Sequence, residues 1–564
     1  MSESSQSSHP GASPDFSGLL SQAFESTLAQ FKGFSMSGAP VGSAFDAAKL
    51  ERIQQDFIAQ ASELWNQSLN ANLKLKDRRF SSDAWAHQPA SQFGAALYML
   101  SSRTMVNLTD ALEIEPKTKA RIKFAVEQFV AASAPSNFFA TNVDAIDLAL
   151  KTQGASLSQG LENLVHDLRQ GHVSMTDESL FEVGKNVATT QGQVVFENAF
   201  FQLIDYTPLT SKVFEKPLLL VPPCINKFYI LDLQPENSFI RYAVAQGHRT
   251  LVVSWNNPKE SMAGATWEDY IEHGVLQAIE VATDLSPKGQ INTLGFCVGG
   301  TMLTCALAVL AARGESPVSS ATLLTTLVDF SNTGILDVFI DEPMVQMREM
   351  QYANGGLLPG RDLAQTFSFL RPNELVWNYV VGNYLKGQTP AAFDLLYWNS
   401  DATNLPGPFY AWYLRNTYLE NRLVKPGLVE ICGESIDMGA IQLPVFIYGS
   451  QEDHIVPVEA AYASTQIFKG PKTFVMGASG HIAGVINPPE AHKRSHWVST
   501  KRSFPAKLQT WVESAKEVPG SWWPHWAEWL QAQAGARVPA PKRAGNVNFK
   551  PIESAPGRYV AVKV

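Results

Sequence analysis

Cysteine is scarce in this sequence of 564 residues, which contains only four. No two of them are spaced as C-x-x-C, so we expect neither a disulfide framework nor a structural zinc site. Lys and Arg are absent from the first 31 residues, which excludes the basic start of a secretory signal. Long apolar runs are also missing. The longest, 302–312, covers 11 residues with Thr304 inside it, whereas a membrane-spanning helix needs about 20. These absences predict a soluble, cytosolic protein with no transmembrane segment.

Positive charge is in deficit, with 44 Lys and Arg against 53 Asp and Glu and a net charge of −9. A nucleic-acid-binding protein or a polybasic membrane anchor needs a cationic face, so this balance argues against both classes. Hydrophobic residues make up 45% of the chain and charged ones only 17%, which is enough apolar material for a large core. The sequence also lacks a phosphate-binding glycine-rich loop, a dinucleotide fingerprint and a metal-ligand cluster, so we expect no metal and no cofactor.

The N-terminal third of the chain reads as helical after a polar start. Residues 1–45 are rich in Ser, Gly and Pro, which predicts a disordered leader. A helical pattern follows, with breaks at Pro135 and Gly171. Its first stripe has apolar residues at steps of three and four, namely Leu50, Ile53, Phe57, Ala61 and Leu64. We predict a helical N-terminal domain over 46–190.

From residue 191 to 564, short apolar runs alternate with helical segments. Runs this apolar are typical of strands buried on both faces, hence of a parallel sheet covered by helices. The predicted strands are 216–221, 250–254, 291–296, 321–328, 444–448 and 472–476, with helices at 267–284 and 299–312. The pattern predicts a catalytic domain of the α/β class, with a doubly wound, mostly parallel sheet.

More than a hundred residues separate the last two of these strands from the others. Aromatic residues occupy 15 of the 110 positions in 331–440, about 14% against 10% for the whole chain. An insertion this long and aromatic beside a sheet edge predicts a cap or lid over a site. A helical subdomain with its own core would give the same pattern, and the two interpretations are compatible.

The pentapeptide Gly-Phe-Cys-Val-Gly at 295–299 ends a predicted strand and opens a predicted helix. This is the pattern of a nucleophile elbow, with Cys297 in the reactive position and glycines two residues before and after it. The helix N-terminus favours a thiolate and a developing oxyanion, and the backbone N–H of Val298 is the first oxyanion donor we expect. The other cysteines lack this context. Cys305 and Cys432 are interpreted as structural, and Cys224, in a turn, stays a minor candidate.

A thiol nucleophile needs a base, and the base needs an orienting carboxylate. On this kind of sheet the order along the chain is nucleophile, acid, histidine, at the carboxyl ends of later strands. Asp453 follows the strand 444–448 and His481 follows the strand 472–476, so both are expected at that edge. Glu452 and Asp329 are alternative acids, and His454 is an alternative base.

A second oxyanion donor is expected in the loop after the strand 216–221. Backbone N–H groups at Cys224 or Ile225 are the candidates, although a rigid Pro-Pro turn with no catalytic task fits the same residues. A tryptophan cluster at 522–529 could form a binding box, but packing of the final helix is the favoured interpretation.

Several long segments resemble the polyhydroxyalkanoate synthases, most closely the single-subunit class I type. They include PPCINKFYILDLQPENS (222–238), GFCVGGT (295–301), WNSDATNLPGPFYAWYLR (398–415), YGSQEDHIVP (448–457), GASGHIAGVINPP (477–489) and GSWWPHW (520–526). The resemblance extends from DRRFSSDAW (77–85) to APGRYV (555–560), in the same order throughout.

The resemblance implies an α/β-hydrolase-like catalytic domain and a catalytic triad of Cys297, Asp453 and His481. It also implies (R)-3-hydroxyacyl-CoA substrates, typically 3-hydroxybutyryl-CoA, the growing polyester as product, and release of CoA. It further implies a homodimer on the surface of cytoplasmic polyester granules, with granule-associated proteins as further partners and no cofactor beyond the CoA thioester substrate. Two other functions stay open on the residues alone: a cysteine-dependent thioesterase or polyester depolymerase on the same fold, and a non-catalytic granule-coat protein.

Overall fold

The computed structural model describes residues 16–35, 45–70, 73–501 and 503–564. Within it the chain divides into two compact units, described separately below. The first comprises residues 1–174 with 371–390, and the second comprises 175–370 with 391–564.

The first unit is helical. Its α-helices are α1 (Phe16–Ser35), α2 (Ala47–Leu69), α3 (Asp83–Ala86), α4 (Pro89–Asp110), α5 (Pro116–Ala132), α6 (Val143–Lys151) and α7 (Ala155–Gln170). Gly171 ends α7 in the left-handed conformation, with φ 84°, at the break that the sequence predicts. The N-terminal stretch of the unit ends at residue 174, so residues 175–190, which we expected here, belong to the second unit.

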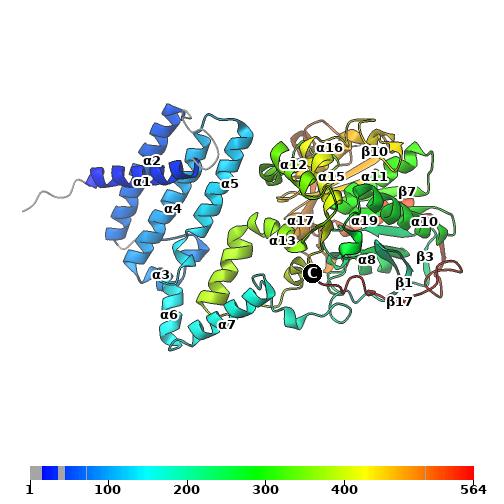
Figure 1. The fold of residues 1–564 in the computed structure, drawn as a ribbon, viewed down its shortest axis with the longest axis horizontal. Coiled ribbons are helices and arrows are strands. Elements are labelled where there is room, and N and C mark those ends of the chain that lie inside the picture. Colours follow the sequence, from blue (N-terminus) through cyan, green and yellow to red (C-terminus); the bar gives the residue numbers. More distant parts are fainter. Residues whose placement is uncertain (1–15, 36–44, 71–72, 502) are drawn as a thin grey trace, which may run out of the picture. The chain divides into compact units, whose positions relative to one another are not determined.

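The prediction of a disordered leader is wrong for residues 16–35, which form α1 (Figure 1). The reason is an apolar face with spacing four and three: Phe24, Leu28 and Phe31 are buried in the core of the unit. Phe24 packs against Phe57 of α2 with ring centroids 5.7 Å apart. The rest of the predicted leader, apart from residue 45, lies outside the described residues.

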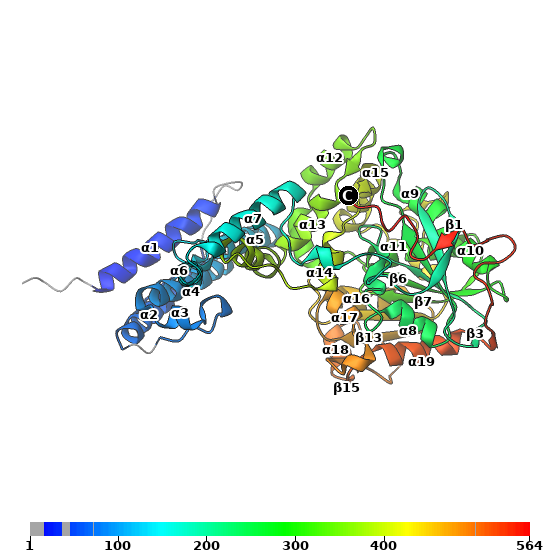
Figure 2. The ribbon, with the colours of Figure 1, turned by 90° about the horizontal axis from the view of Figure 1, so that it is seen from below.

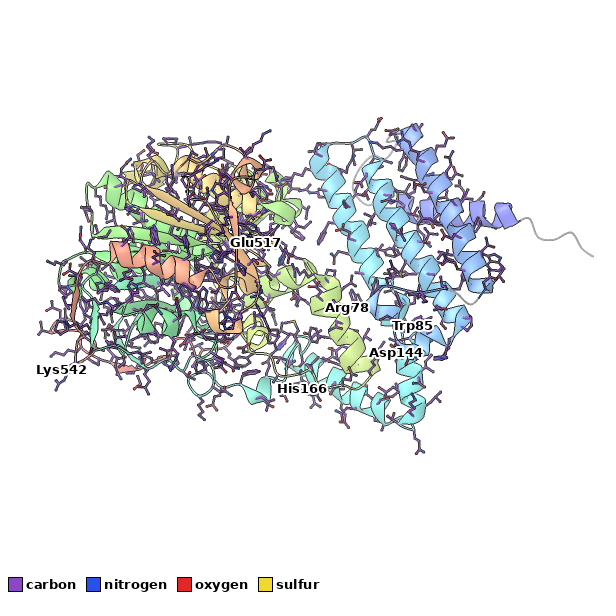
Figure 3. The ribbon with its side chains drawn as sticks, turned by 180° about the vertical axis from the view of Figure 1, so that it is seen from behind. Arg78, Trp85, Asp144, His166, Glu517 and Lys542 are labelled. Atoms are coloured by element: carbon purple, nitrogen blue, oxygen red, sulfur yellow. The ribbon has the colours of Figure 1, made fainter. Side chains whose placement is uncertain are left out.

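The amphipathic stripe predicted after residue 46 is confirmed as α2. Phe57 and Ala61 are fully buried in the helical core, and the other three stripe residues pack partly buried against it. A smaller cluster lies around Trp85 of α3, labelled in Figure 3, whose ring meets Phe80 edge-on at 4.9 Å.

Residues 371–390 pack in the first unit although they lie within the predicted cap at 331–440. They contain two short π-helical turns, η8 (Asn373–Trp377) and η9 (Val380–Leu385), and η9 lies against α7. The Tyr384 hydroxyl donates to Asp167 at 2.7 Å, and Asn163 donates to the carbonyl oxygen of Asn383 at 3.0 Å. The predicted insertion is therefore shared between the two units.

The second unit is built on one sheet, which has eleven strands among the described residues. In spatial order they are β15 (Lys516–Pro519), β14 (Ser495–Val498), β13 (Lys472–Gly477), β12 (Val445–Ser450), β7 (Val318–Leu324), β6 (Ile291–Phe296), β4 (Leu218–Val221), β5 (Thr250–Trp255), β2 (Phe201–Tyr206), β1 (Gly192–Glu197) and β17 (Glu553–Ser554). The central six, from β13 to β5, are parallel, and the flanking strands are antiparallel. Shorter two-stranded ribbons are made by β3 (Lys212–Phe214) with β16 (Arg537–Pro539), β8 (Leu357–Leu358) with β9 (Leu405–Pro406), and β10 (Glu430–Ile431) with β11 (Glu434–Ser435).

Helices cover both faces of the sheet, which confirms the predicted doubly wound architecture. The helices of this unit are α8 (Phe239–Ala245), α9 (Trp267–Asp269), α10 (Gln277–Asp284), α11 (Val298–Ala312), α12 (Glu342–Gln351), α13 (Gly360–Phe369), α14 (Asp394–Ser400), α15 (Gly407–Tyr413), α16 (Val458–Ile467), α17 (His481–Val485), α18 (Leu508–Val512) and α19 (Trp523–Gln533). Side chains of α10, α11 and α16 form one large core with one face, and those of α8, α17 and α19 form a second core with the other. Figure 2 shows α11 and α19 on opposite sides of the strands.

The six predicted strands correspond to the six parallel strands of the sheet. Most boundaries differ by one or two residues, and the largest difference is in the strand predicted at 321–328, which is β7 and ends at Leu324. The residues after it are still apolar, but Thr325 has φ 39°, outside the strand region, so the chain turns there.

Strand β4 lies between β5 and β6, so the direction of winding reverses beside it. Loops at the carboxyl ends of the strands on either side of such a reversal diverge and leave a crevice, where ligands of open α/β sheets bind. The predicted nucleophile follows β6, and the predicted oxyanion loop follows β4. The topology therefore brings both to one edge of the sheet.

Candidate active site

Cys297 stands between β6 and α11 on a sharp turn. Its backbone has φ 53° and ψ −128°, a conformation that residues with a side chain rarely adopt. Its N–H donates to the carbonyl oxygen of Leu324 on β7 at 3.0 Å, and its own carbonyl accepts from the N–H of Gly300 at 2.9 Å. These bonds hold the turn, and the thiol is half-buried. The predicted strand, turn and helix around the cysteine are confirmed.

The glycines around Cys297 are required by close backbone contacts. A Cβ on Gly295 would lie 2.4 Å from the Cα of Gly300, and one on Gly299 would lie 2.3 Å from the carbonyl oxygen of Val221. Gly300 has the same restriction, because its Cβ would lie 2.1 Å from Oγ1 of Thr326. The start of α11 therefore presses directly on the end of β4, which only residues without a side chain allow.

Asp453 and His481 meet at the same edge of the sheet. Asp453 lies in the loop after β12, and His481 is the first residue of α17, after β13. The imidazole Nδ1 lies 2.7 Å from Oδ2 of Asp453, and both side chains are buried. The other carboxylate oxygen, Oδ1, accepts from the N–H groups of Ile455 and Val456 at 2.8 and 2.9 Å. With Nδ1 on the carboxylate, Nε2 is the ring nitrogen left for a second partner.

Burial and two neighbouring side chains determine how strongly His481 holds a proton. Burial lowers its pKa, but the charge of Asp453, the charge of Cys297 and hydrogen bonds to both side chains outweigh burial and raise the pKa to about 10. Because Cys297 influences this pKa, its thiol lies near the imidazole, and the two halves of the site meet there. An imidazole with a raised pKa takes a proton from a neighbouring thiol readily, which is what a cysteine nucleophile requires.

The alternative acids and base lie elsewhere. Glu452 is exposed to solvent. Asp329 accepts hydrogen bonds from the Asn421 side chain at 2.7 Å and from the N–H of Ser331 at 2.8 Å. The histidine that the structure shows bonded to Asp453 is His481.

The predicted oxyanion loop is held at both of its ends. The indole N–H of Trp255 donates to the carbonyl oxygen of Pro222 at 2.8 Å, and that of Trp398 donates to the carbonyl oxygen of Lys227 at 2.7 Å. Lys227 is itself buried, and its ammonium group donates to the carbonyl oxygen of Val562 near the C-terminus. The loop containing Cys224 and Ile225 is therefore fixed beside the first turn of α11, where Val298 is the first residue and its N–H has no partner within the helix.

The remaining cysteines are poor nucleophiles. Burial, with a further contribution from the charge of Cys297, raises the pKa of the Cys224 thiol far above its usual range. Burial raises the pKa of Cys305 to about 12 and also raises that of Cys432. Because the thiolate is the reactive form, these three stay unreactive thiols at neutral pH.

Within the residues that the structure describes, no group of three or more His, Cys, Asp or Glu side chains could hold a metal ion. In the same part of the chain, no helix combines the length and apolar character needed to cross a membrane.

Comparison with known proteins identifies the family. Residues 76–243 match the model described as the N-terminus of poly-beta-hydroxybutyrate polymerase (PhaC), and residues 217–488 match the alpha/beta hydrolase fold. The poly(3-hydroxyalkanoate) polymerase subunit PhaC of Cupriavidus necator is 56% identical over 534 residues, which cover 93% of this chain and 90% of that protein. The chain belongs to the poly(3-hydroxyalkanoate) polymerase family.

Two further members are similar over most of their length. The polymerase subunit PhaC of Rhizobium meliloti is 39% identical, with 92% of this chain and 86% of that protein covered. The polymerase of Methylorubrum extorquens is 41% identical, with 86% and 81% covered. Among solved structures, an esterase from Thermogutta terrifontis aligns with 61% of this chain and 98% of its own at 14% identity, but its TM-score of 0.31 is too low to add to the fold assignment. The resemblance noted from the sequence, the α/β-hydrolase fold and the assignment as an acyl-transferring enzyme are confirmed.

Two features of this poly(3-hydroxyalkanoate) polymerase site were not predicted. Phe296, the residue before the nucleophile, stacks on the His481 ring with centroids 5.7 Å apart. Tyr413 and Tyr418 come from the insertion and lie close enough to Cys297 for its charge to add to burial in raising their pKa values. The signal for Phe296 was its place in the elbow motif, and Tyr413 lay in the family-like segment 398–415. No pattern in the sequence marked Tyr418.

Proposed function

We propose that this chain joins (R)-3-hydroxyacyl groups from CoA thioesters into a polyester and releases CoA, with the growing acyl group carried on Cys297. Short-chain substrates such as 3-hydroxybutyryl-CoA are the preferred monomers in this proposal, as the class I resemblance implies. The observation that carries it is one imidazole, His481, which is bonded through Nδ1 to Asp453 and lies close enough to the thiol at the elbow for Cys297 to raise its pKa. The scheme needs no cofactor.

Acylation begins when His481 takes the proton of the Cys297 thiol. The thiolate attacks the thioester carbonyl, and the negative charge that develops on its oxygen is stabilised by the N–H of Val298 and by one from Cys224 or Ile225. The tetrahedral intermediate collapses, the bond between carbon and the CoA sulfur breaks, and the CoA thiolate takes the proton from the imidazolium. One thioester replaces another, so the bound acyl group keeps its reactivity towards a hydroxyl.

Elongation uses the 3-hydroxyl of another substrate molecule or chain end. This oxygen attacks the acyl group on Cys297, the new ester bond forms, and the carbon–sulfur bond breaks. His481 takes the hydroxyl proton and returns it to the departing sulfur. Asp453 could orient His481 or take the hydroxyl proton directly. Both of its oxygens already accept hydrogen bonds, one from His481 and the other from two backbone N–H groups, which supports the orienting role.

Water must be kept from the acylated cysteine, because hydrolysis would end chain growth. Tyr413 and Tyr418 are partly buried near Cys297, and they pack edge-on with ring centroids 5.4 Å apart. Both come from the aromatic insertion, which supports its proposed role as a lid.

The cellular setting of the proposal comes from the family resemblance. It includes the cytoplasm, the surface of polyester granules, a homodimer and granule-associated proteins. Co-sedimentation of the full-length protein with granules tests the location, and its mass in solution at several concentrations tests the dimer.

The reaction is tested by incubating the full-length protein with 3-hydroxyacyl-CoA substrates of increasing chain length. Released CoA is measured as free thiol, and the acyl product is separated into free acid and polyester. We expect CoA release matched by insoluble polyester, fastest with the four-carbon substrate. Free 3-hydroxy acid as the main product would instead identify a thioesterase, and unchanged release by Cys297→Ala would refute the covalent mechanism.

A further inference from the structure

Helix α17, which begins with His481, is only five residues long. A helix of this length is not stable by itself, because nucleation costs more than one turn of hydrogen bonds returns. The position of the imidazole therefore depends on what holds α17 in place. The bond to Asp453 fixes only the imidazole ring of His481 and not the backbone of α17.

The carbonyl groups at the far end of α17 are all bonded to side chains from other parts of the chain. The Gly484 carbonyl accepts from the hydroxyl of Tyr448 at 2.8 Å and from the indole N–H of Trp522 at 3.1 Å. The Val485 carbonyl accepts from the indole N–H of Trp523 at 2.9 Å. Arg494 bonds the carbonyl of Ala483. The last carbonyls of a helix have no partner within it, so these donors replace a missing turn.

The donors are themselves immobilised. Tyr448, Trp522 and Trp523 are each 1% exposed or less. Trp522 stacks on Tyr448 with centroids 4.3 Å apart and on Phe239 at 5.8 Å, and Trp523 meets the same phenylalanine edge-on at 5.1 Å. A buried indole N–H that loses its acceptor is costly, so each bond restrains the helix as firmly as it restrains the tryptophan.

Helix α17 also has no room to shift. A Cβ on Gly484 would lie 2.2 Å from Oγ of Ser450 and 3.0 Å from the hydroxyl oxygen of Tyr448. The backbone of α17 is thus in direct contact with the end of β12, the strand that leads to Asp453. Small changes at Gly484 would move the two residues of the His–Asp pair relative to each other.

We propose that Tyr448, Trp522 and Trp523 form a carbonyl clamp whose function is to position His481 for its reaction with Cys297. The three are positioning residues, since they act through α17 and not on the substrate. The inference rests on the proposed function, in which His481 is the base. It also gives the tryptophan cluster of 522–529 a task beyond packing of the final helix.

The third tryptophan of the cluster provides a matched control. Trp526 is as buried as the other two and packs on the same phenylalanine at 4.6 Å, but its indole N–H donates to Oγ1 of Thr322 on β7. Changing any of the three to Phe keeps an aromatic ring and removes one buried N–H. If the cluster only packs, the three variants should behave alike.

The experiment compares Trp522→Phe, Trp523→Phe and Trp526→Phe in the full-length protein. Iodoacetamide alkylation of Cys297 as a function of pH reports on the thiol and its base without substrate, CoA release gives kcat and KM, and denaturant unfolding gives stability. We expect Trp522→Phe and Trp523→Phe to lower kcat and alkylation about tenfold with little change in KM, since misplacement of a reacting group by 1 Å can cost about a hundredfold. Trp526→Phe should stay within about twofold of the unchanged protein at a comparable loss of stability. Equal effects of all three at equal stability would overturn the clamp.

Tyr448→Phe covers the case in which the tryptophan variants do not fold, because it removes one hydroxyl and no ring. We expect a smaller loss of kcat, about threefold, since the Trp522 bond to the same carbonyl remains; an unchanged rate and alkylation profile would then count against the clamp. The low-field proton resonance of the His481–Asp453 hydrogen bond separates the two proposals. If this resonance is weakened in the clamp variants and not in Trp526→Phe, the result supports the clamp. This holds even if Cys297→Ala keeps turnover and the proposed function fails.

Discussion

Cys297 and His481 both stand at the start of a helix that follows a parallel strand, β6 for the first and β13 for the second. Helix α11, after Cys297, has 15 residues, and all but its last two are buried. Helix α17 has five, and donors from β12 and the tryptophan cluster hold its end. The elbow is thus fixed by its own glycines and by backbone contacts with β4 and β7, whereas the histidine is fixed by side chains 33 to 42 positions away in the sequence.

The difference explains how each part of the site responds to change. At the elbow, the backbone conformation is set by glycines whose replacement collides with other backbone atoms. At α17, the conformation is set by side-chain hydrogen bonds, each of which can be removed without a collision. We therefore expect abrupt losses on the elbow side and graded losses on the histidine side.

The largest effect is expected from Cys297→Ala, which removes the nucleophile and leaves the elbow backbone intact. CoA release should fall at least about 1,000-fold, because the covalent step has no substitute, and Cys297→Ser should retain a trace at most. Cys305→Ala, on the same helix but buried away from the reaction, serves as the control and should stay within about twofold. Substantial turnover by the alanine variant would show that Cys297 is not the nucleophile.

His481→Gln should be nearly as damaging, with a loss of CoA release of about 1,000-fold, because the thiol then has no base. His454→Gln is the matched control in the adjacent loop and should have little effect. Initial rates of CoA release at fixed substrate rank the two variants. A larger loss in His454→Gln than in His481→Gln would show that His454, and not His481, is the base.

Gly299→Ala tests the close backbone contacts that hold the elbow. Its Cβ would lie 2.3 Å from the Val221 carbonyl oxygen and 2.5 Å from that of Pro222, so α11 or the oxyanion loop must move. We expect a loss of about 3 kcal/mol in unfolding free energy, the upper end for overpacking, together with at least a tenfold drop in kcat. Gly264→Ala, where a Cβ meets no atom within 4 Å, should be neutral in both measurements. Equal behaviour of the two variants would show that the elbow tolerates a side chain.

Asp453→Asn tests the histidine side through its pKa. The Asp453 carboxylate is the largest influence that raises the pKa of His481, and burial lowers it, so the variant's His481 pKa should fall from about 10 towards or below its ordinary 6.5. The imidazole becomes a weaker base, and alkylation of Cys297 near pH 7 should slow. Asp329→Asn, the alternative acid, should leave the pH profile of alkylation unchanged. An unchanged profile, or one that moves to lower pH in Asp453→Asn, would contradict the assignment.

The smallest effect concerns stability. Because the folded-state pKa of His481 is raised, its protonation stabilises the fold fully below about pH 6.5, and this contribution is lost as the pH rises through about 10. The difference in unfolding free energy between the unchanged protein and His481→Gln should therefore shrink from pH 6 to pH 10. Denaturant titrations at several pH values measure it, and a difference that grows with pH would contradict the pKa direction.

The sequence predicted the centre of the sheet well and its edges poorly. The six parallel strands are continuous apolar runs because both of their faces are covered, and that composition is visible without a structure. Strands β14 and β15 are short and partly exposed, so no such run marks them. The helix α1 was missed because its apolar face is three residues set among Ser and Gly, and the segment 371–390 was misplaced because only its contacts with α7 assign it to the helical unit.

The candidate site divides in the same way. Cys297, Asp453 and His481 were predictable because each follows a recognisable strand, in the order that the fold requires. The carbonyl clamp was not predictable, because neither Trp522 nor Trp523 lies near α17 in the sequence and an indole N–H can serve any nearby carbonyl. Tyr418 was missed for a related reason, since an aromatic residue in a buried region carries no mark of what it contacts, whereas Phe296 was marked only by its place in the elbow motif.

The central claim is that the Cys297 sulfur carries the growing acyl chain. The most direct measurement is peptide mapping by mass spectrometry after the protein is mixed briefly with 3-hydroxybutyryl-CoA and quenched in acid. The account predicts that the peptide containing Cys297 gains one or more hydroxybutyryl units and that no such peptide appears in Cys297→Ala. An adduct on another residue, or polymer formation with Cys297 unmodified throughout, would contradict it.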